Sequence, residues 1–440
     1  MTPEIPATPG GDAADLVAAT NVNSPPNSPV PVNDDEPLSQ NRDFKVVLGG
    51  QGVSSFGDAI SNTALPLLVL ALTGSGTAMG IVGALSTLPD LLVGLLAGAY
   101  ADRWDRRRMM FIADLGRAAL TALVPISIVL GWPTMVVVLL VTFPINVLRV
   151  LWLAAWTACV PGLVGRGQVA RANAIFEAFF NVGWIAGPGL AGVLSAQIGP
   201  GPTIALDAAS FLFSSGAILL VRRSLRPEHR EDRPHILTDV REGIRYVVTH
   251  PTLRAVIALW SASSVITAAL GTALTYHMIR ERGAGKEVVG LILSAFSVGS
   301  LAGSLIASRL GVTRVGPVML TGTALTGLSL LAIIIEPPVP FVLFFALLAG
   351  IVQAAVVISY LTFRTALSPD HMLGRIGSTA RTISVGLMPI GAMIGGAMVD
   401  LISGRATLAG MGLLLLLLAA VLALMPTVRS AVVPRRGAIS

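Results

Sequence analysis

Long apolar runs separated by short polar segments extend over most of the 440-residue chain. A helix needs about 20 apolar residues to cross about 30 Å of hydrocarbon, and twelve runs reach that length. A polar segment at residues 222–250 divides them into two sets of six. The pattern predicts transmembrane helices at residues 46–72, 77–101, 109–130, 134–160, 170–196, 201–221, 251–277, 287–308, 314–335, 339–364, 375–402 and 406–426.

The same pattern divides the chain into five parts. Residues 1–43 are rich in Pro and acidic residues, and they lack the apolar stretch of a signal peptide and the apolar mass of a core. We expect this part to be a disordered cytoplasmic tail. Residues 44–221 and 251–428 would form two six-helix bundles connected by a cytoplasmic linker at 222–250, and residues 429–440 would form a cytoplasmic C-terminal tail.

Composition and charge agree with a multi-pass protein of the cell membrane. Hydrophobic residues make up 53% of the chain and charged residues only 12%, about half the usual share in a soluble domain. Basic residues concentrate in alternate loops, which places both termini in the cytoplasm by the positive-inside rule. The net charge of +6 therefore reflects membrane topology, and we expect no nucleic-acid partner. We expect the protein to be a monomer in the lipid bilayer.

The most informative short stretch joins the second apolar run to the third. It contains a glycine, an aspartate four residues later and several arginines: Gly98, Asp102, Arg103, Arg106 and Arg107. This pattern resembles the signature loop between helices 2 and 3 of the major facilitator superfamily of transporters. The resemblance implies an all-α membrane fold of twelve helices in two pseudo-symmetric bundles. It also implies a conformational latch, in which Asp102 is attracted by the start of helix 11 and by Arg375.

A second resemblance lies in the fifth apolar run. Its small residues and its proline, which are Gly183, Gly187, Pro188 and Gly192, resemble the motif that antiporters of the superfamily carry in helix 5. Glycines at this spacing let a neighbouring helix approach closely, and Pro188 removes a backbone donor. The stretches 54–58, 64–67 and 72–75 also resemble the first helix of the branch that contains macrolide-efflux proteins and the enterobactin exporter. The resemblance covers roughly residues 45–426 and favours export.

Ionisable residues inside the predicted helices are costly in lipid and usually face an aqueous cavity. Asp58 and Asp90 lie near mid-depth of helices 1 and 2, and either is a candidate to carry a proton. Structural pairing with a buried arginine is the alternative. Arg149 is the candidate partner, and it loosely resembles a helix-4 arginine of proton-coupled exporters. Glu177 is a third proton-coupling candidate. With Arg381 it would line a cytoplasmic gate, or it would simply be solvated in a vestibule.

Helices 1, 4, 7 and 10 line the central cavity in the superfamily's fold. In helices 1, 4 and 10 of this chain, polar residues recur in pairs at helical spacing, so that the two members of a pair share one helix face. The pairs are Asp58 with Asn62, Asn146 with Arg149, and Gln353 with Tyr360. The residues that we expect to line the substrate cavity are Asn62, Asn146, Arg149, Gln353 and Tyr360.

These observations predict a secondary active exporter of a small hydrophobic molecule, such as a drug, a siderophore or a related metabolite. Proton antiport and alternating access would drive it. No catalytic constellation, metal-ligand spacing or ATP-binding loop stands out, so we expect neither an enzyme nor a cofactor. The alternatives are a proton-coupled nutrient symporter and a non-transporting sensor or scaffold. The sign of the substrate's charge stays open, because the acidic residues favour a cation whereas Arg149 and Arg381 favour an anion.

Overall fold

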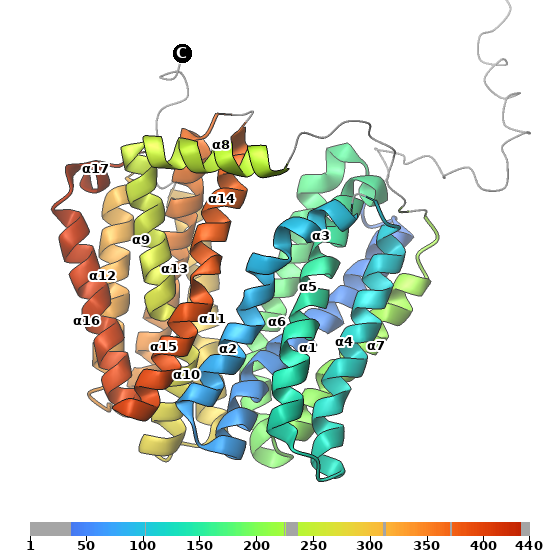
Figure 1. The fold of residues 1–440 in the computed structure, drawn as a ribbon, viewed down its shortest axis with the longest axis horizontal. Coiled ribbons are helices and arrows are strands. Elements are labelled where there is room, and N and C mark those ends of the chain that lie inside the picture. The colour runs from blue at the N-terminus through green and yellow to red at the C-terminus, as the bar shows by residue number, and fades with distance from the viewer. Residues whose placement is uncertain are drawn as a thin grey trace, which may run out of the picture.

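The computed structural model describes residues 37–101, 103–223, 225, 236–310, 314–369 and 372–432. Within these ranges the regular structure is helical, without strands (Figure 1). The N-terminal bundle contains α1 (Arg42–Thr73), α2 (Gly76–Leu92), α3 (Gly94–Ala101), α4 (Arg106–Val129), α5 (Thr134–Val164), α6 (Val169–Gln197) and α7 (Pro200–Leu219). The C-terminal bundle contains α9 (Pro251–Thr267), α10 (Leu270–Tyr276), α11 (Lys286–Leu310), α12 (Val315–Ile333), α13 (Val339–Leu367), α14 (Leu373–Gly386), α15 (Met388–Leu401), α16 (Gly404–Ala423) and α17 (Pro426–Arg429).

The predicted fold of twelve transmembrane helices is confirmed in the described part of the chain. Eleven helical runs are long and apolar enough to cross a membrane, and α2 and α3 together supply the twelfth. Three of the predicted helices are interrupted. A turn at Val93 separates α2 from α3, and Ala268 and Ala269 separate α9 from α10. Leu387 separates α14 from α15, where Pro389 lacks the amide that would continue the helix.

Helix α1 begins four residues before the predicted start, because polar side chains cap and anchor it. The side chain of Asn41 accepts a hydrogen bond from the Phe44 amide and donates one to the Leu163 carbonyl. The carboxylate of Asp43 accepts from the amides of Arg222 and Arg223, at 3.1 and 2.8 Å. The first residues of the predicted linker are therefore held against the N-terminal bundle.

The predicted linker at 222–250 contains a helix, α8 (Ile236–Thr249), instead of loop alone. It lies across one end of the C-terminal bundle and contacts α9 and α14 (Figure 1). Val247 is buried in the core of that bundle, and the Tyr246 hydroxyl donates to the Leu367 carbonyl at 2.9 Å. We call this end of the molecule the α8 end, and the opposite end the far end.

The core of the N-terminal bundle consists of two apolar clusters, one near each end. Phe44, Trp156 and Leu163 belong to the cluster at the α8 end, whereas Leu68 and Val138 belong to the cluster at the far end. This division leaves the middle of the bundle for polar side chains.

Most of the contact between the two bundles is made by two helix pairs, α2 with α15 and α6 with α11. Small residues allow these backbones to approach closely. A Cβ atom added at Gly80 would lie 2.6 Å from the Ala392 carbonyl oxygen, and one added at Gly192 would lie 3.0 Å from the Gly290 Cα atom. Figure 1 shows α2 and α15 side by side toward the far end.

The glycines of the helix-5 motif lie on α6 and contact two different helices. Added Cβ atoms at Gly183 and Gly187 would meet Ser55 and Ala59 of α1, at 3.2 and 2.5 Å. Gly192 and the carbonyl of Pro188 instead face Gly290 of α11, in the other bundle. The motif therefore connects the wall of the N-terminal bundle with the contact between bundles.

We expect Gly187→Leu to destabilise the protein by about 1–3 kcal/mol, because the larger side chain overpacks the contact with α1. The check is the thermal unfolding midpoint of the purified protein in detergent. Gly216→Leu on α7 is the control, since open space surrounds that exposed position. Equal midpoints for the two variants would contradict close packing at Gly187.

Candidate functional site

A cavity of about 460 Å³ opens in the middle of the N-terminal bundle, lined by α1, α2, α4, α5, α6 and α7. Trp152 and Phe176 of the core cluster at the α8 end contribute to its wall, as do Val124, Val141 and Ile204 of the cluster at the far end. The ionisable residues among its lining are Asp58, Arg117, Arg149, Glu177 and Asp207.

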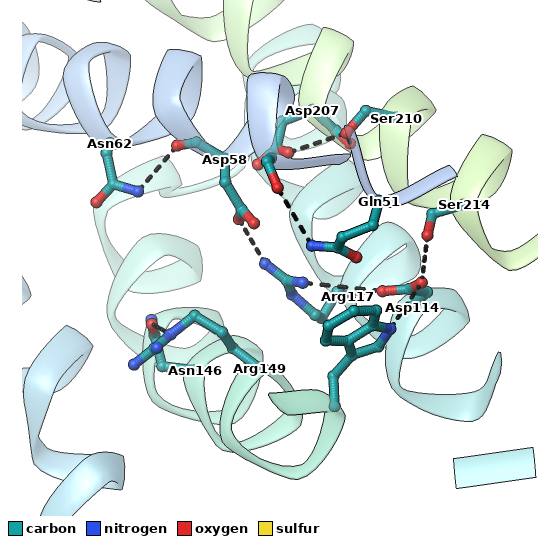
Figure 2. A network of polar contacts seen from close by, with 12 residues as sticks. Gln51, Asp58, Asn62, Asp114, Arg117, Asn146, Arg149, Asp207, Ser210 and Ser214 are labelled. Atoms are coloured by element: carbon teal, nitrogen blue, oxygen red, sulfur yellow. Dashed lines mark hydrogen bonds and ion pairs between the residues drawn. The ribbon is translucent and has the colours of Figure 1, made fainter. Parts of the chain in front are cut away.

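Arg117 of α4 is the centre of a buried ionic cluster in this wall (Figure 2). Only 2% of its side chain is exposed, and its guanidinium donates to the carboxylate of Asp58 on α1. A second nitrogen lies 3.8 Å from Asp114, one turn earlier on α4. The guanidinium also lies over the ring of Phe211, 3.9 Å from its centroid. Charge, hydrogen bonding and a π face thus replace the water that this cation lost.

Two further carboxyl groups surround the same guanidinium. Asp114 is fully buried, and its Oδ2 accepts hydrogen bonds from the Ser214 hydroxyl at 2.7 Å and from Trp152 Nε1 at 3.2 Å. Asp207 of α7 is 3% exposed, accepts from the Ser210 hydroxyl at 3.2 Å and interacts electrostatically with Arg117. Asp58 differs from both, because 20% of its side chain is exposed.

A glycine lets the two helices that carry these carboxyl groups approach. An added Cβ at Gly57 of α1 would lie 2.6 Å from Oδ1 of Asp207 on α7. Three carboxyl groups therefore share one guanidinium, and full ionisation would leave the cluster with two excess negative charges in the bundle core.

A second ionic group connects the two bundles. Arg149 of α5 donates to Oδ2 of Asp90 at 2.5 Å and to Oδ1 of Asn146 at 3.1 Å. Arg381 of α14 approaches the other oxygen of Asp90, at 3.5 Å. Asp90 thus receives one arginine from its own bundle and one from the opposite bundle.

Polar contacts also join the bundles at the far end. The Asp400 carboxylate, near the end of α15, accepts from the amides of Gly76 and Thr77 at 2.6 and 2.8 Å and from the Ser75 hydroxyl at 2.6 Å. The ammonium of Lys286 donates to the Ser195 carbonyl at 3.2 Å. An anion thus caps the N-terminus of α2, and a cation meets the C-terminal turn of α6, as helix dipoles favour.

This fold and the sequence have known relatives. Residues 36–435 match a family profile described as transmembrane secretion effector. The chain belongs to this family of major facilitator transporters. The predicted superfamily is confirmed, and the chain is a multi-pass membrane transporter rather than an enzyme.

Two of the relatives are efflux proteins by name. The chain is 29% identical over 383 residues to the multidrug efflux pump Tap of Mycolicibacterium fortuitum, with 85% of this chain and 93% of Tap covered. It is 26% identical over 391 residues to the enterobactin exporter EntS of Citrobacter koseri, with coverage of 84% and 89%.

Solved structures share the fold at low sequence identity. The nucleoside transporter NupG matches with a TM-score of 0.73 at 12% identity, covering 87% of this chain and 99% of NupG. An inward-facing, unoccupied bacterial homologue of the human lysosomal transporter Spinster matches with a TM-score of 0.70 at 13% identity, with coverage of 89% and 98%. These likenesses concern the fold alone.

The transporter's cavity contains some of the residues expected there and lacks others. Asn62 and Asn146 line it, and each side-chain amide donates to a backbone carbonyl one turn earlier, at 2.8 and 2.9 Å. Gln353 and Tyr360 of α13 are not among its described lining. Tyr360 is buried in the core of the C-terminal bundle and stacks on Trp260, with ring centroids 5.0 Å apart. The sequence spacing of Gln353 and Tyr360 predicts that they share a helix face, but it does not indicate whether that face points to the cavity.

The proposed latch lies partly outside the described residues. Asp102 is not among them, and the side chain of Arg375 is not described. Arg106 donates to the Ala101 carbonyl at 3.2 Å, and Arg107 donates to the carbonyls of Ile218 and Leu219 at 3.2 and 2.6 Å. These two arginines therefore hold the ends of α3 and α7. Arg103 is exposed, and open space surrounds Gly98.

Sequence reasoning missed three members of the cluster, namely Asp114, Arg117 and Asp207. Each is an ionisable residue within a predicted transmembrane helix, which is the same signal that identified Asp58. Asp114 and Arg117 are also three residues apart, so that they share a helix face.

Proposed function

We propose that this transporter exports a small hydrophobic molecule from the cell in exchange for protons. The observation that carries the proposal is the cluster of three carboxyl groups around Arg117 in the cavity wall. The efflux functions of the relatives named above and the glycine–proline motif of α6 favour export over uptake. A sensor or scaffold would have no use for so costly a buried cluster.

The proton step is an exchange at Asp58. Two excess negative charges in a bundle core are strongly unfavourable, so the cluster is stable with proton bound. Asp58 is its most exposed carboxyl group, which makes it the point where protons enter and leave through the cavity. Protonation of Asp58 weakens its bond to Arg117, and the guanidinium then retains Asp114 as its partner. The contact between α1 and α4 therefore changes with the charge.

Export requires that proton and substrate favour different states of the protein. A substrate entering the cavity displaces the proton, and a proton from outside restores the empty protein to its starting state. Each inward proton supplies about 2.3 kcal/mol for every 100 mV of membrane potential when a neutral molecule leaves in exchange. Exchange of one proton for a monovalent cation moves no net charge, and the pH gradient alone then drives it.

Alternating access is rocking of the two bundles against each other. The basic loops put the α8 end in the cytoplasm, so the far end, where Asp400 and Lys286 join the bundles, is the external side. Opening to the outside breaks these contacts. Asp102 and Arg375 then close the cytoplasmic side as a latch.

Asp58→Asn should abolish proton flux coupled to substrate, because the amide cannot exchange a proton. Downhill exchange of substrate should be largely retained. The measurement uses proteoliposomes and the dye that the wild-type protein moves fastest among cationic, neutral and anionic fluorescent dyes. Asp90→Asn is the comparison, and it should keep coupled proton flux. Coupled flux of wild-type size in Asp58→Asn would remove Asp58 from the mechanism and pass the role to Asp90 or Glu177.

Asp400→Ala should shift the protein toward states that are open at the far end, because α2 loses its cap from the opposite bundle. The readout is the distance between spin labels on Trp132→Cys and Ile335→Cys in a Cys159→Ser background. Both labelled positions are exposed, and they lie on loops of different bundles. We expect a larger population of long distances.

Glu281→Ala is the matched control for this experiment. The Glu281 carboxylate caps α16 through the amides of Gly404 and Arg405, within one bundle. Its loss should leave the distance distribution unchanged. Identical distributions for Asp400→Ala and the parent protein would show that the contact does not hold the far end closed.

A further inference from the structure

We propose that the transported molecule is an amphipathic organic cation, and that Glu177, Phe180 and Trp184 of α6 bind its positive charge. The inference rests on the proposed function in one respect, that the cavity of the N-terminal bundle holds the transported molecule. It decides the sign of charge that the sequence left open.

The arginines that would attract an anion already have carboxylate partners. Arg117 is paired with Asp58 and lies beside Asp114, and Arg149 is paired with Asp90. Arg381 also contacts Asp90 from the opposite bundle. An anionic substrate would have to compete with these carboxylates for each guanidinium.

Glu177 is in the opposite situation. Its side chain is exposed and lines the cavity, and in the described part of the chain its carboxylate has no hydrogen bond or ion pair. The polar contact in which the residue takes part is the bond from the Asn181 amide to the Glu177 backbone carbonyl, at 2.7 Å. The charge left uncompensated at this wall is therefore negative.

Aromatic rings continue from Glu177 along the same face of α6. Phe180 and Trp184 follow at three and seven residues, a spacing that keeps side chains on one helix face, and both line the cavity. Their ring centroids are 5.8 Å apart, with planes tilted by 42°. Organic cations bind favourably over such π faces, and a nearby carboxylate adds attraction. Among the described residues, Trp184 Nε1 is buried without a hydrogen-bond partner.

We call Glu177, Phe180 and Trp184 the stripe. Its position connects it with Asp58, the proposed proton site. Glu177 is eight residues from the start of α6, about 12 Å along the axis at 1.5 Å per residue, so it lies toward the α8 end. Gly183, just before Trp184, packs on Ser55 and Phe56 of α1. Ser55 is three residues before Asp58, so the Trp184 end of the stripe lies at a level about one turn of α1 from Asp58. A cation that moves along the stripe approaches the carboxyl cluster around Arg117. There it can compensate the excess negative charge in place of a proton.

The test measures binding of two ions of matched shape and opposite charge, tetraphenylphosphonium and tetraphenylborate, to the purified full-length protein in detergent. The wild-type protein should bind the phosphonium more tightly than the borate. Glu177→Gln should weaken phosphonium binding by about threefold to tenfold, the range expected for one partly exposed charge and its π neighbours. Borate binding should be unchanged or tighter. Phe180→Leu should also weaken phosphonium binding more than borate binding.

Glu336→Gln is the control, because it removes a carboxylate that pairs with Arg405 in a loop outside the cavity. Both affinities should match those of the wild type. Thermal unfolding should show that Glu177→Gln folds normally, since the exposed carboxylate has no partner among the described residues. Equal binding of the two ions by the wild type, or no effect of Glu177→Gln, would overturn the proposal.

Proton flux in proteoliposomes separates this inference from the proposed function. Charge-selective binding without proton flux on phosphonium addition would refute proton antiport and leave the cation site standing. Proton flux driven by tetraphenylborate but not by tetraphenylphosphonium would refute the cation site and leave antiport standing.

Discussion

The burial of Arg117 among three carboxyl groups is the constraint on which the N-terminal bundle depends. A guanidinium in a bundle core requires counter-charge and hydrogen-bond acceptors, and here they come from α1, α4 and α7 at once. These groups lie between the apolar clusters at the two ends of the bundle. Because carboxyl groups outnumber the cation, the same arrangement that holds three helices together also supplies the excess negative charge on which the proposed proton exchange relies.

Simple electrostatics at helix ends connects this bundle to the other one. Asp400 caps α2 across the bundle interface, and Lys286 meets the C-terminal turn of α6. Between these polar contacts, glycines such as Gly80 and Gly192 bring backbones together without interlocking side chains. An interface of closely packed glycines with a few polar contacts at its end suits the proposed rocking of two rigid bundles. Few interactions would have to break when the far end opens.

The sequence predicted the fold well because hydrocarbon thickness imposes a minimum length on each apolar run. It also identified Asp58, Asp90 and Arg149 as ionisable groups in the membrane. It also named Arg149 as the candidate partner of these carboxylates, and Arg149 pairs with Asp90. It did not indicate that Asp58 meets Arg117, because helix rotation decides which side chains face each other. The same rotation buries Tyr360 in the other core. Helix α8 was missed because its amphipathic pattern lies within a charged segment that reads as a loop.

The most direct measurement of the central claim is the number of protons released when the purified wild-type protein binds tetraphenylphosphonium. A weakly buffered solution and a pH-sensitive dye suffice, with calorimetry in two buffers of different ionisation enthalpy as an independent count. The account predicts release of about one proton for each phosphonium bound, because ligand and proton are linked through the same cluster. Saturable binding that releases no proton across the physiological pH range would contradict it.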